Sequence, residues 1–251
     1  MIALFVAMIE PAPAHTVHVW LADVPSPDAP HLAGWLGWLS AEERARFDRF
    51  QHAGARTEFL VGRALVRTTL SRYADVPPEA WAFAIGSHGR PDLATRPPGT
   101  PPLVFNLSHT RGLAACAVTV DRELGVDVEF TGRSFTHDVP GRFFAAEEVR
   151  ALRALPEAEQ HAVFFDYWTL KEAYIKARGL GLAIPLHQFA FTRHAGGGRT
   201  LWCAPDLADD GTTWQFWQGS PSPAHRLAVA VRRTGADLAV TVRRVIPGAV
   251  A

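Results

Sequence analysis

A long helix with clear signals for its end is the feature of this sequence that most constrains its fold. Apolar side chains at helical spacing run from about Ala158 to Arg178, and Gly179, Gly181 and Pro185 then stop the helix. Short runs typical of strands stand before and after it, so the helix belongs to a fold that mixes both kinds of element.

The rest of the chain repeats this mixture. Ser40 to Glu43 form a capping box that opens a helix, and helical runs follow at 55–73 and 145–155. Residues 86–102 are rich in glycine, proline and arginine and are expected to form a loop. The pattern predicts an α+β fold whose two halves join near residues 120–125. The expected strands are 16–22, 81–85, 103–107, 113–120 and 124–130, then an antiparallel meander of 189–192, 213–217, 227–233 and 238–245.

The composition is that of an ordinary globular protein in water. Hydrophobic residues make up 48% and charged residues 20%, with a formal net charge of +0. A nucleic-acid binder usually presents a strongly basic face, so neither nucleic acid nor an anionic membrane is an expected partner. Cys116 and Cys203 have no metal-type spacing, and we interpret them as reduced thiols of a cytoplasmic protein.

The apolar residues 1–9 do not have the pattern of a signal peptide, because the first basic residue is Arg44. The run is also too short to cross a bilayer. We interpret it as an edge strand, a tail or an over-long start, and we expect no transmembrane segment.

Two carboxylates share one face of the predicted strand 124–130. Side chains two residues apart on a strand point the same way, so Asp127 and Glu129 lie together, opposite Val126, Val128 and Phe130. At roughly 4 Å and an effective dielectric near 20, their repulsion costs about 4 kcal/mol. Solvation at a polar edge, protonation of one group or a bound cation would each relieve it.

The long helix carries a ridge that is suited to a site. Trp168, Glu172 and Lys176 follow i, i+4, i+8 spacing, and the aromatic side chain indicates that the ridge is partly buried. Glu172 and Lys176 also stand in the order of an ordinary surface ion pair, which is worth only about 0.2–0.5 kcal/mol. A partly buried glutamate with a lysine one turn away is the better candidate for a functional site.

Lysine occurs at only two positions, Lys171 and Lys176, whereas arginine occurs 23 times. A chain that prefers arginine and keeps lysine here favours a site for a compact ammonium charge, such as a phosphate site. The alternative is that two lysines stand together by chance on a solvated helix face.

Two segments of the first half carry polar groups suited to an anion. Ser108 and His109 follow a strand, and their side chains point apart on an extended chain, so they suit separate donors better than a catalytic pair. Residues 87–91 form a glycine-proline loop that presents the guanidinium of Arg90 before Pro91. Most such loops are simple turns.

Three carboxylates, two lysines, a Ser-His pair and a loop arginine suit a divalent metal and a phosphorylated ligand. The segments FNLSH, GVDVE and WTLKEAYIKARGLGL, in this order, resemble the signature of the 4′-phosphopantetheinyl transferases. The length is similar to that of the surfactin-type (Sfp-type), pseudo-dimeric branch. The resemblance covers about residues 40–192.

This resemblance implies two similar α+β halves, residues 1–122 and 123–251, related by a pseudo-two-fold axis with the active site at their interface. It implies that the first half contacts the adenosine part of coenzyme A and that the second carries the metal and catalytic residues. The implied ligands of Mg²⁺ are Asp127, Glu129 and Glu172. The implied contacts to coenzyme A are Arg46, Arg90, Pro91, Ser108, His109, Lys171 and Lys176, and the implied catalytic residues are Glu172, Lys176 and His109.

Within this family pattern, Arg90 stands where lysine is common, and it would meet the adenosine 3′-phosphate. Glu43 stands where lysine can occur, and the capping box explains it better. The implied reaction moves the 4′-phosphopantetheine arm of coenzyme A to a serine of an apo acyl or peptidyl carrier protein, and a monomer is expected. A non-catalytic coenzyme A or nucleotide module and a Mg²⁺-dependent phosphohydrolase remain the alternatives.

Overall fold

The computed structural model describes residues 9–133, 139–194 and 196–249, so residues 1–8 of the apolar N-terminal run lie outside the described part. Runs of helices and runs of strands follow each other along the chain, which confirms the predicted α+β class. The chain forms two compact units, Met1–Asp121 with Leu238–Ala251, and Arg122–Asp237.

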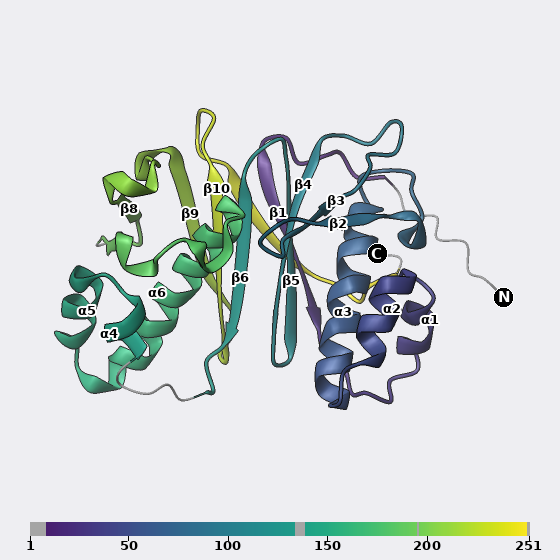
Figure 1. Cartoon of the computed structure of the whole chain (residues 1–251), viewed down its shortest axis with the longest axis horizontal. Coiled ribbons are helices and arrows are strands. Elements are labelled where there is room, and N and C mark those ends of the chain that lie inside the picture. The colour runs from purple at the N-terminus through teal and green to yellow at the C-terminus, as the bar shows by residue number, and fades with distance from the viewer. Residues whose placement is uncertain (1–8, 134–138, 195, 250–251) are drawn as a thin grey trace. The chain divides into compact units, whose positions relative to one another are not determined.

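The first unit is a four-stranded sheet of order β11-β1-β5-β4, covered by a long helix (Figure 1). Strands β1, β5 and β4 pair antiparallel, and α3 packs on all three. A short hairpin, β2–β3, follows a 3₁₀ turn. The elements are β1 (Thr16–Asp23), α1 (Leu32–Leu36), α2 (Ala41–Asp48), α3 (Ala53–Leu70), η1 (Pro78–Ala80), β2 (Phe83–Ile85), β3 (Pro91–Leu93), β4 (Leu103–Thr110), β5 (Leu113–Val120) and β11 (Ala239–Arg244).

The second unit repeats the plan with a three-stranded antiparallel sheet of order β6-β10-β9, on which the long helix α6 packs. The hairpin β7–β8 forms a separate two-stranded sheet. The elements are β6 (Leu124–Phe130), α4 (Val139–Phe143), α5 (Ala146–Arg153), α6 (Glu157–Arg178), η2 (Gly181–Ala183), η3 (Leu186–Gln188), β7 (Phe189–Arg193), β8 (Arg199–Cys203), η4 (Pro205–Leu207), η5 (Gly211–Thr213), β9 (Trp214–Ser222) and β10 (His225–Arg232).

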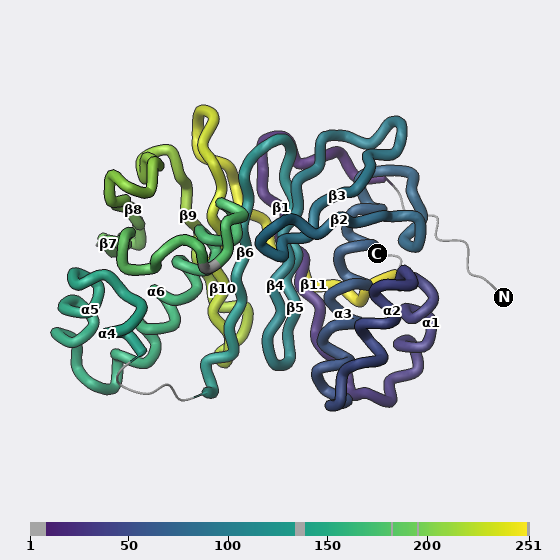
Figure 2. Tube along the Cα trace, viewed as in Figure 1, coloured from purple at the N-terminus to yellow at the C-terminus, as the bar shows by residue number. Residues whose placement is uncertain are grey.

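The predicted C-terminal meander is wrong at both ends. Among the described residues β7 pairs with β8 alone, and β11 runs parallel to β1 in the first sheet. Figure 2 traces β11 among the elements of the first unit. Strand β10 already has β6 on one side and β9 on the other, so it offers no open edge to β11. Strand β1 has an open edge to which β11 pairs, and residues 238–251 therefore group with the first unit.

The ends of the long helix follow the sequence signals. Helix α6 ends at Gly179, whose φ of 66° is a left-handed conformation that glycine adopts without strain. The N–H of Gly179 donates to the carbonyls of Ile175 and Lys176. The helix therefore stops where the sequence predicts, directly after the ridge that carries Glu172 and Lys176.

Candidate active site

Strand β6 places two carboxylates on the face that α6 covers. Gly125, Asp127 and Glu129 share this face because side chains alternate along a strand. A Cβ on Gly125 would lie 2.0 Å from the carbonyl oxygen of Ala173 and 2.5 Å from the amide nitrogen of Ala177. Only glycine permits this close approach of α6, which brings the next two side chains of the face to the helix.

The predicted ridge of α6 lies along these carboxylates. Lys176 Nζ is 2.6 Å from Asp127 Oδ1, and Trp168 Nε1 donates to Glu129 Oε1 at 3.0 Å. Asp127 is buried, and Lys176 is partly exposed. The ammonium and the indole thus hold the two β6 carboxylates from positions two helical turns apart, and Glu172 stands between them on the ridge.

Glu172 lies in the electrostatic field of the same group. Burial, followed by repulsion from Asp127, raises the pKa of Glu172 to about 7. Lys176 opposes this rise and Glu129 adds to it. Burial and Asp127 also raise the pKa of Glu129, against the attraction of nearby Arg133. Asp127 thus repels the negative charge of both glutamates, and a bound cation would offset this repulsion.

The predicted metal ligands fit magnesium by their chemistry. Across residues 9–133, 139–194 and 196–249, no group of three or more His, Cys, Asp and Glu side chains is placed so that it could hold a metal ion by itself. Lys176 holds Asp127, while Trp168 and Arg133 hold one oxygen of Glu129. Magnesium takes oxygen ligands and typically needs only one or two protein carboxylates beside phosphate oxygens, so a group that could hold the ion by itself is not required.

In the first unit, Ser108 and His109 lie within β4, which runs on to Thr110 rather than ending at Leu107. Ser108 is buried and His109 is exposed, as expected for neighbours on opposite faces of a strand. His109 lies on the face that α3 covers, where a Cβ on Gly62 would be 3.7 Å from its ring. The two side chains can therefore serve as separate donors and not as a nucleophile and its base.

Arg90 ends the loop that connects β2 to β3, directly before Pro91. Pro91 begins β3 and pairs with Ile85 of β2, and the N–H of Gly86 donates to the Arg90 carbonyl at 2.9 Å. The expectation of a loop over 86–102 is wrong only for Pro91–Leu93, which form β3, because strand pairing depends on a partner that local composition does not reveal. The Arg90 guanidinium reaches 3.5 Å from the carbonyl oxygen of Phe105 on β4.

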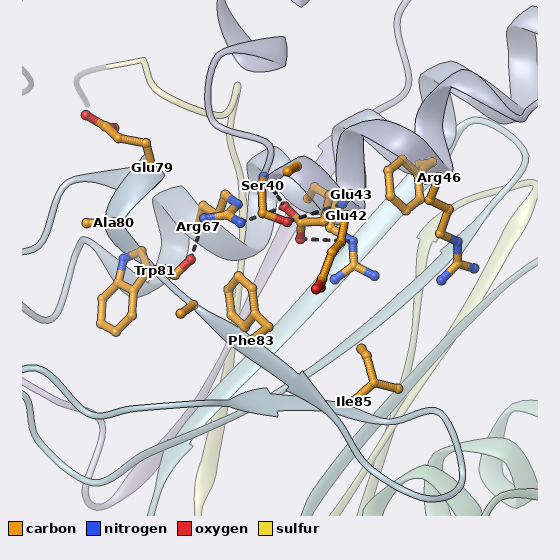
Figure 3. A pocket seen from close by; sticks show the side chains of 14 residues that line it. Ser40, Glu42, Glu43, Arg46, Arg67, Glu79, Ala80, Trp81, Phe83 and Ile85 are labelled. Atoms are coloured by element: carbon orange, nitrogen blue, oxygen red, sulfur yellow. Dashed lines mark hydrogen bonds and ion pairs between the residues drawn. The ribbon is translucent and has the colours of Figure 1, made fainter.

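A pocket of about 490 Å³ opens beside α2, α3 and β2 (Figure 3). Arg46 and Arg63 both line it, and their guanidinium groups lie 5.4 and 5.3 Å from the centre of the Phe59 ring. Sequence reasoning found Arg46 and missed Arg63. The available signal was the i, i+4 spacing of Phe59 and Arg63, which places them on one ridge of α3.

Glu43 occupies the inner wall of this pocket. Its carboxylate accepts from the Ser40 N–H at 3.0 Å, and its own N–H donates to the Ser40 hydroxyl, which confirms the capping box. The same carboxylate lies 2.6 Å from Arg67 and 3.7 Å from Arg63. Glu43 therefore has a structural role: it caps α2 and pairs with arginines of α3.

Two regions of the chain match known protein families. Residues 25–120 match the N-terminal region of 4′-phosphopantetheinyl transferases, and residues 123–231 match the 4′-phosphopantetheinyl transferase superfamily. The chain is 39% identical to the 4′-phosphopantetheinyl transferase HetI of Nostoc sp. over 168 residues, which cover 66% of this chain and 70% of HetI. The chain belongs to the 4′-phosphopantetheinyl transferase superfamily.

Other relatives support this assignment. The putative 4′-phosphopantetheinyl transferase slr0495 of Synechocystis sp. is 30% identical over 211 residues, which cover 79% of this chain and 84% of the relative. The transferase Sfp of Bacillus subtilis is 28% identical over 195 residues, which cover 78% and 83%. The chain is thus an Sfp-type 4′-phosphopantetheinyl transferase, with coenzyme A as donor and a carrier protein as acceptor.

The structure corrects one predicted contact of the transferase. Lys171, expected to bind coenzyme A, is fully buried. Its Nζ donates to the carbonyls of Leu186 at 2.8 Å and Phe189 at 2.7 Å, and lies 2.7 Å from Glu148 Oε2. These contacts use all three N–H donors of the ammonium. Lys171 lies about 140° around the helix from Lys176, so it serves the core of the unit and not a phosphate.

No helix in the described part of the transferase is both long and apolar enough to cross a membrane.

Proposed function

We propose that this transferase requires magnesium, which Asp127, Glu129 and Glu172 would hold together with oxygens of coenzyme A. The placement of these carboxylates supports this proposal most directly: Asp127 and Glu129 share the face of β6 that α6 covers, and burial followed by repulsion from Asp127 raises the pKa of both Glu129 and Glu172. Bound magnesium would offset the charge that builds on the pyrophosphate oxygens of coenzyme A during transfer.

Lys176 is the proposed donor to the phosphates. It now pairs with Asp127 at 2.6 Å and is partly exposed, so its ammonium lies at the edge of the carboxylate group, where it can also meet a ligand. A compact ammonium suits an exchange between a carboxylate and a phosphate oxygen better than a planar guanidinium does. It would stabilise charge on the leaving adenosine 3′,5′-bisphosphate.

Glu172 is the proposed general base for the serine hydroxyl of the carrier protein, directly or through one water molecule. A general base works best when its pKa lies near the working pH, and the pKa of Glu172 is raised to about 7. The acceptor hydroxyl belongs to the carrier protein, so the reaction needs no nucleophile from this chain.

The first unit supplies the proposed contacts to the rest of coenzyme A. Arg90, beside Pro91, would bind the adenosine 3′-phosphate, and Ser108 and His109 would donate to the phosphates. Arg46 would bind at the pocket that it shares with Arg63. Residues 1–122 would thus bind the donor and residues 123–251 would carry the chemistry, in a cytoplasmic monomer.

The test combines the protein with coenzyme A and apo carrier domains from fatty-acid, polyketide and peptide synthetases, and weighs the carriers by mass spectrometry. Transfer should stop after removal of divalent metal with EDTA and return with added Mg²⁺. Calorimetry should also detect Mg²⁺ binding in the presence of coenzyme A, and binding should weaken in Glu129→Gln. Full transfer in EDTA would overturn the magnesium requirement.

A further inference from the structure

A second cavity, of about 680 Å³, opens in the second unit between α5, the turn η3 and strand β8. None of its lining residues belongs to the carboxylate group of β6 and α6. Buried Phe144 and partly buried Val149 form its apolar wall, and Arg150, Arg153 and Trp202 are exposed at its rim. We call this feature the Trp202 groove.

One lining residue of the groove, Trp202, exposes a large aromatic side chain. The side chain of Trp202 is 57% exposed, and Phe143, the chain neighbour of Phe144, is 39% exposed. A single exposed apolar side chain is ordinary on a protein surface. Here the exposed indole of Trp202 stands at an apolar cavity with two exposed arginines, and an aromatic side chain beside arginines is typical of a surface that binds another protein.

The rim is positively charged. Arg150 and Arg153 face one exposed carboxylate, Glu147, which lies 3.2 Å from Arg150. Both members of that pair are more than half exposed, so water screens them and the pair holds neither side chain firmly. The other glutamate of α5, Glu148, is buried against Lys171. The groove therefore suits a partner with an acidic surface.

The wall of the groove continues to the candidate active site. The ring of Phe144 stacks on Phe164 at 5.3 Å and contacts Trp168 at 6.5 Å, and the indole of Trp168 donates to Glu129. The exposed ring of Phe143 also meets the edge of Trp168 at 6.0 Å. A partner seated in the groove would rest on the aromatic cluster that also holds a carboxylate of the site.

We infer that the Trp202 groove docks the carrier protein, through an acidic surface of the carrier and an apolar side chain packed beside Trp202. This inference rests on the proposed transfer to a carrier serine, which needs a large protein substrate to dock close to the carboxylate group. The groove is open, apolar and basic, and none of its residues has a role in the proposed chemistry.

Binding tests the inference without catalysis. A carrier domain with its acceptor serine changed to alanine is titrated against the full-length transferase in the absence of metal and coenzyme A. Trp202→Ala should weaken binding about 10- to 30-fold, the effect of losing an aromatic anchor. Arg150→Glu combined with Arg153→Glu should weaken it about 10-fold at low salt, and the difference should shrink as salt increases.

Kinetics gives a second readout. Both variants should raise the KM for the carrier and leave kcat and the KM for coenzyme A unchanged. Matched controls are Ile246→Ala, an exposed apolar side chain of the first unit, and Arg233→Glu, an exposed arginine of the second unit that pairs with Asp237. Neither control should change the KM for the carrier, and thermal unfolding checks that every variant is folded.

Unchanged carrier binding and carrier KM in both groove variants would overturn the docking inference while leaving transfer intact. A wild-type dimer that Trp202→Ala converts to a monomer would also overturn it, because the groove would then hold a second copy of the chain. Failure of the proposed chemistry looks different, since the wild type would bind carriers and modify none of them.

Discussion

The two units stabilise their long helices with the same device. In the first, Glu43 caps the start of α2 and pairs at 2.6 Å with Arg67 of α3, which is almost fully buried. Arg67 also donates to the carbonyls of Pro78 and Trp81. A glutamate at the third position of a short helix thus fixes a cation of the long helix, and that cation ties down the segment that follows. We call this arrangement a glutamate–cation brace.

The second unit builds the same brace from different residues. Glu148 accepts from the N–H of Ala145 at the start of α5 and pairs with Lys171 of α6, which donates to two carbonyls further along the chain. The two glutamates precede their cations by 24 and 23 residues, and in each unit the two carbonyls stand three residues apart. The brace therefore belongs to the fold plan of both units.

What differs is the residue next to the brace. Glu172 follows Lys171, whereas Thr68 follows Arg67, and the Thr68 hydroxyl donates a hydrogen bond to the carbonyl of Ala64. In the second unit Gly125 also brings β6 against the helix, so that Asp127 and Glu129 lie along its ridge. Both units thus have the brace, and the second unit adds an acidic residue directly after the brace cation and two carboxylates on the strand that the helix covers.

The largest expected effect on transfer comes from substituting Glu172, the residue directly after the brace cation Lys171. Glu172→Gln should lower kcat/KM for transfer by about 10³-fold, because it removes the proposed base and one metal ligand. The matched change Thr68→Val in the first unit should alter kcat/KM no more than a few-fold. Carrier mass spectrometry measures both, and near-normal transfer by Glu172→Gln would remove it from both proposed roles.

Breaking the brace should cost stability in both units, and more in the second. Lys171→Met leaves the buried Glu148 carboxylate without its cation, which should cost about 3–5 kcal/mol in the free energy of unfolding. Arg67→Met should cost less, about 1–3 kcal/mol in the free energy of unfolding, because Glu43 is partly exposed and keeps Arg63 nearby. Urea denaturation measures both losses.

The pH dependence has a definite sign. Burial raises the pKa of Glu148 even with Lys171 present, and in Lys171→Met this rise should grow. A carboxyl whose folded pKa is raised destabilises the fold while it is ionised, so the loss in Lys171→Met should shrink as pH falls. A loss that stays constant down to pH 4 would contradict a lone buried carboxylate as its cause.

Five residues after each buried cation stands a second cation, Lys176 in the second unit and Arg72 in the first, and we expect the two to differ in their effect on kcat. Lys176→Arg keeps the charge but should lower kcat about 10- to 100-fold, because a planar guanidinium cannot replace a point charge between Asp127 and a phosphate. Its counterpart Arg72, which pairs with Glu10, should tolerate Arg72→Lys with little change in kcat. Equal effects at the two positions would contradict a special role for Lys176.

Close helix packing should matter more at Gly125 than at any glycine of α3. Gly125→Ala forces β6 away from the backbone of α6 and should cost about 1–3 kcal/mol of stability, with loss of transfer. Gly62→Ala in α3 meets the end of the Leu107 side chain at 3.3 Å and the His109 ring at 3.7 Å, and its effect on stability should stay within about 1 kcal/mol. Thermal unfolding compares the two.

The smallest expected effect tests whether Arg90 of the first unit contributes to coenzyme A binding and not to the rate of the chemical step. Arg90→Ala should raise the KM for coenzyme A about tenfold, or about 1.4 kcal/mol, and leave kcat unchanged. It should have little effect with 3′-dephospho-coenzyme A, which lacks the group that Arg90 is proposed to bind. An equal loss with both donors would assign Arg90 to the fold of the hairpin.

Local sequence determined the features that depend on neighbours along the chain. The period of β6 puts Asp127 and Glu129 on one face, and the spacing on α6 puts Glu172 and Lys176 on one ridge. The capping box at Ser40 and the helix stop at Gly179 follow from backbone groups that need local partners. Together with the order of the three motifs, these features pointed to the family.

Only the tertiary structure decided which side of each helix meets the sheet. Lys171 and Lys176 look alike in sequence, yet one is enclosed with Glu148 and the other meets Asp127, because burial depends on what packs against each face. The pairing of β11 with β1 and the shared brace likewise join residues that are far apart in the chain. No local pattern specifies such contacts, since their partners are set by the packing of whole elements.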